Sequence, residues 1–288
     1  MNPKVSLIIG ILCISFSPIF VKLPGAPALT SGFYRIFIAW VFLAPYCIAR
    51  GKLKIGRKEL LIALLGGVIF ASDIAVWNIS LLKMSATIST LLANLAPVWV
   101  GLFGFILFKK RSGRLFWIGT FIAIGGMVIL VGVQHIVALQ FNIGIVLALL
   151  ASLLYAIYIM ITRGILQKID TTTFMFYNML AASIFLLTIC DFEQYDVIHL
   201  SVTAWLCFLA MGLLCQLTGW LTINHSLRHI ESAKVSLALL GQTVLAGFWA
   251  ILFLHESLEL NEIIGSVIVL AGIAITFLRP KQSKKNVI

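Results

Sequence analysis

The sequence predicts an all-α integral membrane protein with ten transmembrane helices in two inverted five-helix repeats. Hydrophobic residues make up 61% of the 288 residues and charged residues only 11%, whereas ordinary soluble chains are about half apolar and a quarter charged. The apolar residues gather into ten runs, most of them about the length that a helix needs to cross a ~30 Å hydrocarbon layer. Part of the sequence also recurs at a shift of 146 residues. These three observations define the expected fold.

Each apolar run is expected to form one span. The spans fall at roughly 5–23, 28–49, 59–82, 84–108, 115–133, 142–163, 172–190, 203–225, 233–254 and 261–278. The runs are continuously apolar without a period of two, which favours helices over a barrel. A helix also bonds every backbone amide within its own segment, as lipid requires. The first run lacks a small-residue cleavage site before Lys22-Leu23-Pro24, so we expect it to be retained as a span.

The internal repeat is clearest in the later three spans of each half. Asn78-Ile79-Ser80-Leu81 recurs as Asn224-His225-Ser226-Leu227. Without a gap, the same shift places Leu91 on Leu237, Val98 on Val244, Gly119 on Gly265 and Gly126 on Gly272. The earlier spans pair at a shift of 143, through Phe33-Tyr34-Arg35 against Phe176-Tyr177-Asn178. Five spans is an odd number, so the second repeat enters the membrane from the opposite face. We expect a first repeat over 1–137 and a second over 138–288, which ends in a short basic cytoplasmic tail.

Basic residues predict the orientation of the chain. If the N-terminus lies inside, all but three of the 21 Lys and Arg residues fall on the inner side. The exceptions are Lys22 and Lys83 on the outer side and Arg35 within a span. This asymmetry predicts a multi-pass protein of the cytoplasmic (inner) membrane with both termini in the cytoplasm. The formal net charge of +11 is therefore a topology signal, and we expect no nucleic-acid partner.

Two ionisable residues lie inside the predicted spans, Arg35 in the second and Asp73 in the third. A charge in hydrocarbon costs roughly 2.5–3.5 kcal/mol on insertion scales, so such a residue normally faces the bundle interior and has a partner. One interpretation is that Arg35 and Asp73 hold the carboxylate and ammonium groups of a zwitterionic substrate, or that Asp73 takes up a proton during transport. The alternative is a structural ion pair that joins spans two and three.

Polar and aromatic side chains on other spans would converge with these two charges. On span three, Asp73 and Trp77 share a helix face with Phe70 and Ser80. The other candidates are Ser15 on span one, Tyr155 and Tyr158 on span six, and Gln216, Trp220 and Asn224 on span eight. Because polar atoms avoid lipid, we expect these residues to line a small-molecule cavity. The alternatives are packing within the bundle or, for rings near span ends, the interfacial aromatic belt.

Two prolines interrupt predicted spans, Pro18 in the first and Pro97 in the fourth. Each removes a backbone donor and frees a carbonyl in the preceding turn. In transporters such broken backbone often lines the substrate path and takes part in gating. A plain kink is the alternative, since proline is frequent in membrane helices.

Several short motifs resemble the ten-span EamA-type branch of the drug/metabolite transporter superfamily. They are Ser15-Phe16-Ser17-Pro18-Ile19-Phe20-Val21-Lys22, Phe33-Tyr34-Arg35, Leu95-Ala96-Pro97-Val98, Leu254-His255-Glu256, Ile264-Gly265 and Leu270-Ala271-Gly272. The resemblance covers about residues 5–278 and implies a carrier that moves small metabolites across the cytoplasmic membrane by alternating access. One departure is that the family often ends the fourth and ninth spans with glutamate. Here the ninth has Glu256 but the fourth has Lys109-Lys110.

We therefore expect a secondary transporter of a small polar metabolite, not an enzyme. Arg35 and Asp73 favour an amino acid or a related zwitterion as the substrate. None of the five cysteines has metal-ligand spacing, and no phosphate-binding loop is present, so we expect no cofactor and no metal. The other expected partners are the small-molecule substrate and the lipid bilayer, with the chain acting as a monomer. The alternative is an intramembrane enzyme with a site at His225, His229 and Glu231 near the inner surface.

Overall fold

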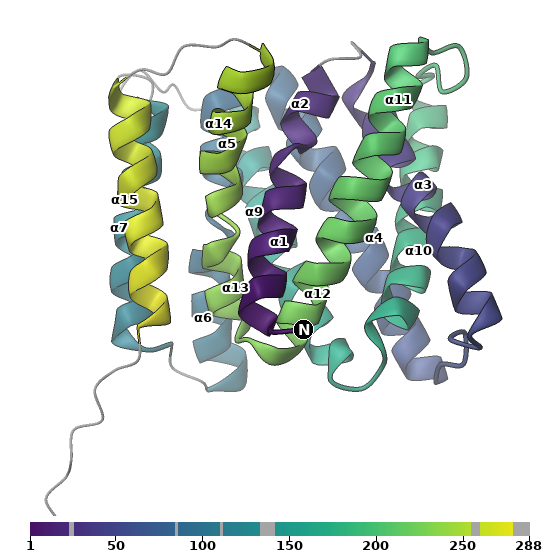
Figure 1. The fold of residues 1–288 in the computed structure, drawn as a ribbon, viewed down its shortest axis with the longest axis horizontal. Coiled ribbons are helices and arrows are strands. Elements are labelled where there is room, and N and C mark those ends of the chain that lie inside the picture. Colours follow the sequence, from purple (N-terminus) through teal and green to yellow (C-terminus); the bar gives the residue numbers. More distant parts are fainter. Residues whose placement is uncertain (23–25, 84–85, 110–111, 133–141, 255–259, 279–288) are drawn as a thin grey trace, which may run out of the picture.

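The computed structural model describes residues 1–22, 26–83, 86–109, 112–132, 142–254 and 260–278. Lys110, Glu256 and the basic tail, which figure in the expectations above, lie outside these ranges. Within them, every regular element is a helix, and the helices stand side by side along one common direction (Figure 1). The predicted all-α membrane fold is therefore confirmed.

The first half of the chain contains unbroken helices and two helices that are each broken into two pieces. Its elements are α1 (Pro3–Ser15), α2 (Ser17–Lys22), α3 (Ala28–Ala49), α4 (Arg57–Lys83), α5 (Ala86–Ala93), α6 (Ala96–Phe108) and α7 (Arg114–Val131). The second half consists of α9 (Ile143–Leu166), α10 (Thr171–Phe192), α11 (Val202–Ala210), the π-helix η1 (Met211–Gly219), α12 (Trp220–His229), α13 (Ser232–Ala238), α14 (Gly241–Leu254) and α15 (Leu260–Phe277).

Seven helical stretches among the described residues are long and apolar enough to cross a membrane. They are Pro3–Val21, Ala28–Ala49, Arg57–Ser80, Ile143–Leu166, Thr171–Phe192, Val202–His229 and Leu260–Phe277. Predicted spans four and five correspond to the shorter apolar helices Leu91–Ile106 and Arg114–Leu130, and span nine corresponds to the pair α13 and α14. The count of ten spans thus stays a prediction.

Helix bounds reproduce the internal repeat. A shift of 146 carries α7 (Arg114–Val131) onto α15 (Leu260–Phe277), and α4 onto the continuous stretch α11–η1–α12. A shift of 143 carries α3 (Ala28–Ala49) onto α10 (Thr171–Phe192). The break between α5 and α6 recurs between α13 and α14. The duplication seen in sequence is therefore also a duplication of structure.

Pro18 and Pro97 each lie at the start of a new helix after a break, whereas Pro45 lies inside the continuous helix α3. Pro18 is the second residue of α2, and Pro97 is the second residue of α6. Proline fits this position because the first amides of a helix have no intrahelical acceptor. The structure thus shows a helix break at each of these prolines, and their part in gating stays a prediction. The equivalent break after Ala238 contains no proline, so the repeat imposes the break even where proline is absent.

The two halves interlock through glycines in α7 and α15, which lie together at one edge of the molecule (Figure 1). A Cβ added to Gly119 would collide with the carbonyl oxygen of Gly272. A Cβ added to Gly126 would lie 2.6 Å from the amide nitrogen of Val269 and 2.9 Å from the carbonyl oxygen of Gly265. The pair is antiparallel, because the earlier glycine of each helix faces the later glycine of the other. Small residues of this kind let membrane helices approach backbone to backbone.

Candidate functional site

Arg35 lies on α3 and holds together parts of both halves. Its Nε donates to Oε1 of Gln216 on η1 at 2.9 Å, and its Nη1 donates to Oγ of Ser17 on α2 at 3.1 Å. Two bonds to separate elements fix the guanidinium in position. Ser17 was not among the candidates from sequence, although it lies in the motif that begins at Ser15.

Gln216 reaches Arg35 because η1 is a π-helix that packs closely on α3. Thr218 Oγ1 donates to the carbonyl of Leu213, five residues earlier, and such wide turns are frequent at functional sites. Gln216, Trp220 and Asn224 follow one another at steps of four residues, so they lie on one helix face. All three side chains are buried. Gly212 allows the close approach, since an added Cβ would lie 2.8 Å from Ile38 Cγ2.

Asp73 does not form the ion pair with Arg35 that was the structural alternative to substrate binding. Within the described residues, neither a hydrogen bond nor an ion pair joins the two side chains. The reason is that α10 packs against both α3 and α4, which contact each other little. Asp73 is nevertheless in electrostatic range of Arg35, Tyr155 and Tyr158. The two charges therefore share the central region without neutralising each other directly.

Aromatic side chains from three helices meet in this region. Phe70 on α4 lies 4.7 Å from Tyr158 on α9 and 5.0 Å from Trp220 on α12, measured between ring centroids. Trp220 also makes edge contacts with Tyr158 at 5.5 Å and Tyr155 at 6.3 Å. The structure thus brings together three of the predicted aromatic residues, Tyr155, Tyr158 and Trp220, and adds Phe70 from the same predicted face as Asp73.

Several polar atoms around this cluster are buried without a hydrogen-bond partner. They are Nε1 of Trp77, Oγ1 of Thr162, Nε1 of Trp220 and Oδ1 of Asn224. The side chains of Thr162 and Asn224 lie close enough to the Tyr158 hydroxyl to interact with it, but neither Thr162 Oγ1 nor Asn224 Oδ1 has the geometry of a hydrogen bond. Leaving such a group buried and unpaired costs about 1–3 kcal/mol, so these atoms lower the stability of the fold.

Ser15 and the two prolines lie at helix breaks rather than in the aromatic cluster. Ser15 Oγ donates to the carbonyl of Leu12 and accepts a hydrogen bond from Trp249 Nε1, both at 2.7 Å. Trp249 also stacks on Phe16 with ring centroids 4.3 Å apart. At the other break, Asn94 Nδ2 on the first half donates to Thr243 Oγ1 on the second at 3.4 Å. Trp249, Asn94 and Thr243 were missed from sequence, although the repeat aligns the two broken helices.

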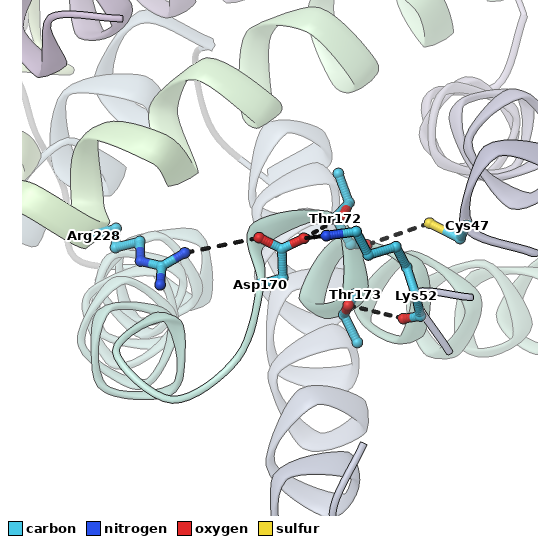
Figure 2. Close-up of polar contacts among 6 residues, drawn as sticks. All are labelled: Cys47, Lys52, Asp170, Thr172, Thr173 and Arg228. Carbon is cyan, nitrogen blue, oxygen red and sulfur yellow. Dashed lines mark hydrogen bonds and ion pairs between the residues drawn. The ribbon is translucent and has the colours of Figure 1, made fainter. Parts of the chain in front are cut away.

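A polar network joins the two halves at the end of the molecule that carries the N-terminus, which is the predicted inner side (Figure 1 and Figure 2). Asp170, which precedes α10, accepts a hydrogen bond from Nζ of Lys52 at 2.6 Å and lies 3.8 Å from Nη1 of Arg228. Thr172 Oγ1 donates to the same carboxylate at 3.1 Å, and Thr173 Oγ1 donates to the carbonyl of Lys52 at 2.8 Å. We call Lys52, Asp170 and Arg228 the inner latch.

The hydrogen bond from Lys52 is the main cause of a lowered pKa for Asp170, and the bond from Thr172 adds to it. The same pairing raises the pKa of Lys52. A carboxylate with a lowered pKa keeps its interactions above its ordinary pKa and loses them only as pH falls through the lowered value. Asp170 and Lys52 therefore stay charged throughout the neutral range.

A groove of about 390 Å³ opens between α4 and α10, away from all of these residues. It is lined by Leu64, Val68, Leu180, Ala181, Ile184, Phe185, Thr188 and Ile189. Its apolar lining suits lipid acyl chains. The cavity expected at the centre of the bundle stays a prediction.

Comparison with known proteins decides the family. The model of the EamA-like transporter family matches residues 4–132 and again residues 142–278, which together span nearly the whole chain. The chain belongs to the EamA-like transporter family. The resemblance found in the sequence motifs is thus confirmed, and this EamA-like protein is a multi-pass membrane protein of a transporter family.

Relatives of this EamA-like chain extend over its full length. It is 22% identical to the uncharacterized transporter YdfC of Bacillus subtilis, over 97% of this chain and 92% of YdfC. It is 21% identical to an uncharacterized transporter of Archaeoglobus fulgidus, over 95% of this chain and 96% of the relative. A solved crystal structure at 15% identity superimposes with a TM-score of 0.81, covering 98% of this chain and 99% of the other. That structural likeness shows the fold.

Two residues of the alternative enzyme site, His225 and His229, contact backbone carbonyls, and their rings lie 4.7 Å apart between centroids in this EamA-like protein. His229 Nδ1 lies 2.8 Å from the carbonyl of His225, and His225 Nε2 lies 3.3 Å from the carbonyl of Met1. Among the described residues, no group of three or more His, Cys, Asp and Glu side chains is placed to hold a metal ion. His225 thus helps to seat the N-terminus on α12, whereas the contact of His229 lies within its own helix.

Proposed function

We propose that this EamA-like protein is a secondary transporter that carries a small zwitterionic metabolite, such as an amino acid, by alternating access. The observation that carries the proposal is that the two intramembrane ionisable residues, Arg35 and Asp73, lie in one region without pairing with each other. Arg35 is fixed by Gln216 and Ser17, and Asp73 lies in its field without pairing with it. A zwitterion would present a carboxylate to the first and an ammonium to the second. Charge-assisted hydrogen bonds of this kind are among the strongest in proteins.

Two further features support a carrier with two moving halves. The antiparallel contact of α7 with α15 agrees with two inverted repeats, and such repeats usually enclose a substrate site between them. The lower end of the molecule, where the N-terminus lies (Figure 1), also carries the basic residues that follow α3 and precede α4. This placement favours cytoplasmic termini in the inner membrane.

Exchange in proteoliposomes tests the proposal. Purified protein is reconstituted with a mixture of unlabelled amino acids inside, and labelled amino acids are added outside one at a time. We expect labelled substrate to accumulate above the level in protein-free liposomes. Absence of exchange for every amino acid and related zwitterion would refute the substrate class.

The inner latch gives a second testable consequence. Because it joins the halves at the inner face, breaking it should favour opening on that side. Cys47 is a natural reporter, since it is buried and its Sγ lies 3.8 Å from the carbonyl of Thr172 beside the latch. In Asp170→Asn, a membrane-impermeant maleimide added to inside-out vesicles should label Cys47 about two to five times faster, a modest factor because partly exposed ion pairs contribute little.

The matched control is Asp191→Asn, which removes an exposed acid near the other end of α10 and should leave labelling unchanged. Cys47→Ala measures the background from the other cysteines. Since the pKa of Asp170 is lowered, the wild-type rate should carry no added pH dependence from the latch between about pH 5 and 8. Equal labelling of wild type and Asp170→Asn would show that the latch does not hold the inner face closed.

A further inference from the structure

Four buried polar side chains form a cluster around Tyr158, which is in electrostatic range of both Arg35 and Asp73. They are Tyr158 and Thr162 on α9 and Trp220 and Asn224 on α12, with exposed fractions of 2%, 0%, 4% and 1%. Tyr158 contacts Trp220 through its ring and lies beside Thr162 and Asn224. Within the described part of the chain, Thr162 Oγ1, Trp220 Nε1 and Asn224 Oδ1 have no hydrogen-bond partner.

Such a concentration of unpaired groups indicates a partner from outside the chain. Buried polar atoms in native proteins nearly always have a hydrogen bond, and each exception calls for an explanation. Apolar residues of similar shape would fill the same space without the cost of desolvation. A group that is bound during the working cycle would satisfy these atoms.

The donors and acceptors define the chemistry of that group. Trp220 Nε1 only donates, Asn224 Oδ1 only accepts, and the hydroxyls of Thr162 and Tyr158 do both. None of these four side chains is an acid or a base at neutral pH, so a bound ammonium or carboxylate would have no opposite charge among them. An uncharged group that both donates and accepts fits, which is a carboxamide or a hydroxyl.

The position of the cluster relates it to the charged site. Gln216, which bonds Arg35, lies on the same buried face as Trp220 and Asn224. Tyr158 is in electrostatic range of both Arg35 and Asp73. A zwitterion held by those two charges would therefore extend its side chain toward the four polar residues.

We propose that Tyr158, Thr162, Trp220 and Asn224 form a subsite that selects amino acids with an uncharged hydrogen-bonding side chain, a carboxamide or a hydroxyl. This inference rests on the proposed function and deepens it. A site built to bond a polar group rejects an analogue that lacks it, because its own polar atoms are then left unpaired.

Competition between isosteric amino acids tests the subsite. In the proteoliposome exchange assay, threonine is compared with valine and asparagine with leucine, because each pair has nearly the same shape. We expect the polar member of at least one pair to compete about tenfold or more better than its apolar partner. Asn224→Leu and Thr162→Val should remove that preference, measured as the ratio of competition within each pair.

Thr120→Val is the matched control, because Thr120 on α7 is also fully buried with an unpartnered hydroxyl but lies outside this cluster. It should leave the preference intact. Equal competition within both pairs would overturn the subsite and leave the transport function standing. Absence of exchange for every amino acid would overturn both. Loss of the preference in Thr120→Val as well as in Thr162→Val would show a general packing effect, and the subsite would again be refuted.

Discussion

Asp73→Asn is expected to abolish transport while the protein remains folded and inserted. The substitution keeps the shape of the side chain but removes the negative charge that would hold a substrate ammonium. Hydrogen bonds to charged groups contribute about 1.5–3 kcal/mol, which corresponds to roughly a tenfold to 150-fold loss of affinity. Arg35→Gln should have an effect of similar size on the carboxylate side. Initial rates of exchange over a range of substrate concentrations measure both.

Two further measurements separate substrate binding from the alternatives. If Asp73 instead takes up a proton, Asp73→Asn would lose accumulation driven by a pH gradient but retain exchange at equal pH. If the charges are purely structural, both variants would unfold at lower temperature while the remaining folded protein would exchange normally. Arg35→Lys is the conservative control, because lysine keeps the charge but lacks the planar fork that bonds Gln216 and Ser17. Unchanged exchange by Asp73→Asn would remove Asp73 from the mechanism.

The membrane fold and the repeat could be predicted because both depend on local pattern. Continuous apolar runs mark helices in lipid, and an ungapped shift of 146 marks equivalent ones. The break between α13 and α14 could have been predicted in the same way, because Pro97 lies at the break in the helix that the shift of 146 makes equivalent. The π-helix η1 could not be predicted, because the residue propensities of Met211–Gly219 do not distinguish it from an ordinary α-helix.

The partners of Arg35 could not be predicted, because they depend on which helices become neighbours. An ion pair with Asp73 was one of the two interpretations of the sequence, but α10 packs against both α3 and α4, and Arg35 bonds Gln216 instead. The inner latch was missed for the same reason. Lys52, Asp170 and Arg228 come from three segments far apart in sequence, and each alone resembles an ordinary charged residue in an inner loop.

The α7–α15 contact gives the largest expected effect on stability. Gly126→Ala would place a methyl group 2.6 Å from the amide nitrogen of Val269, and backbone on the facing helix cannot move aside as a flexible side chain can. Overpacking typically costs about 1–3 kcal/mol, and we expect a loss at the upper end of this range. Thermal unfolding in detergent, followed by the loss of helical circular dichroism, measures it.

The neighbouring glycine provides the control. A Cβ added at Gly125 would meet no atom within 4 Å, and alanine is favoured over glycine in a helix by up to about 1 kcal/mol. Gly125→Ala should therefore be neutral or stabilising, although it differs from Gly126→Ala by one position. Equal unfolding temperatures for the two variants would contradict a backbone-to-backbone contact. A loss of thermal stability in Gly126→Ala alone would show that α7 and α15, which join the two repeats at the edge of the bundle, are held by close backbone contact. Any relative movement of the halves would then have to occur among the other helices.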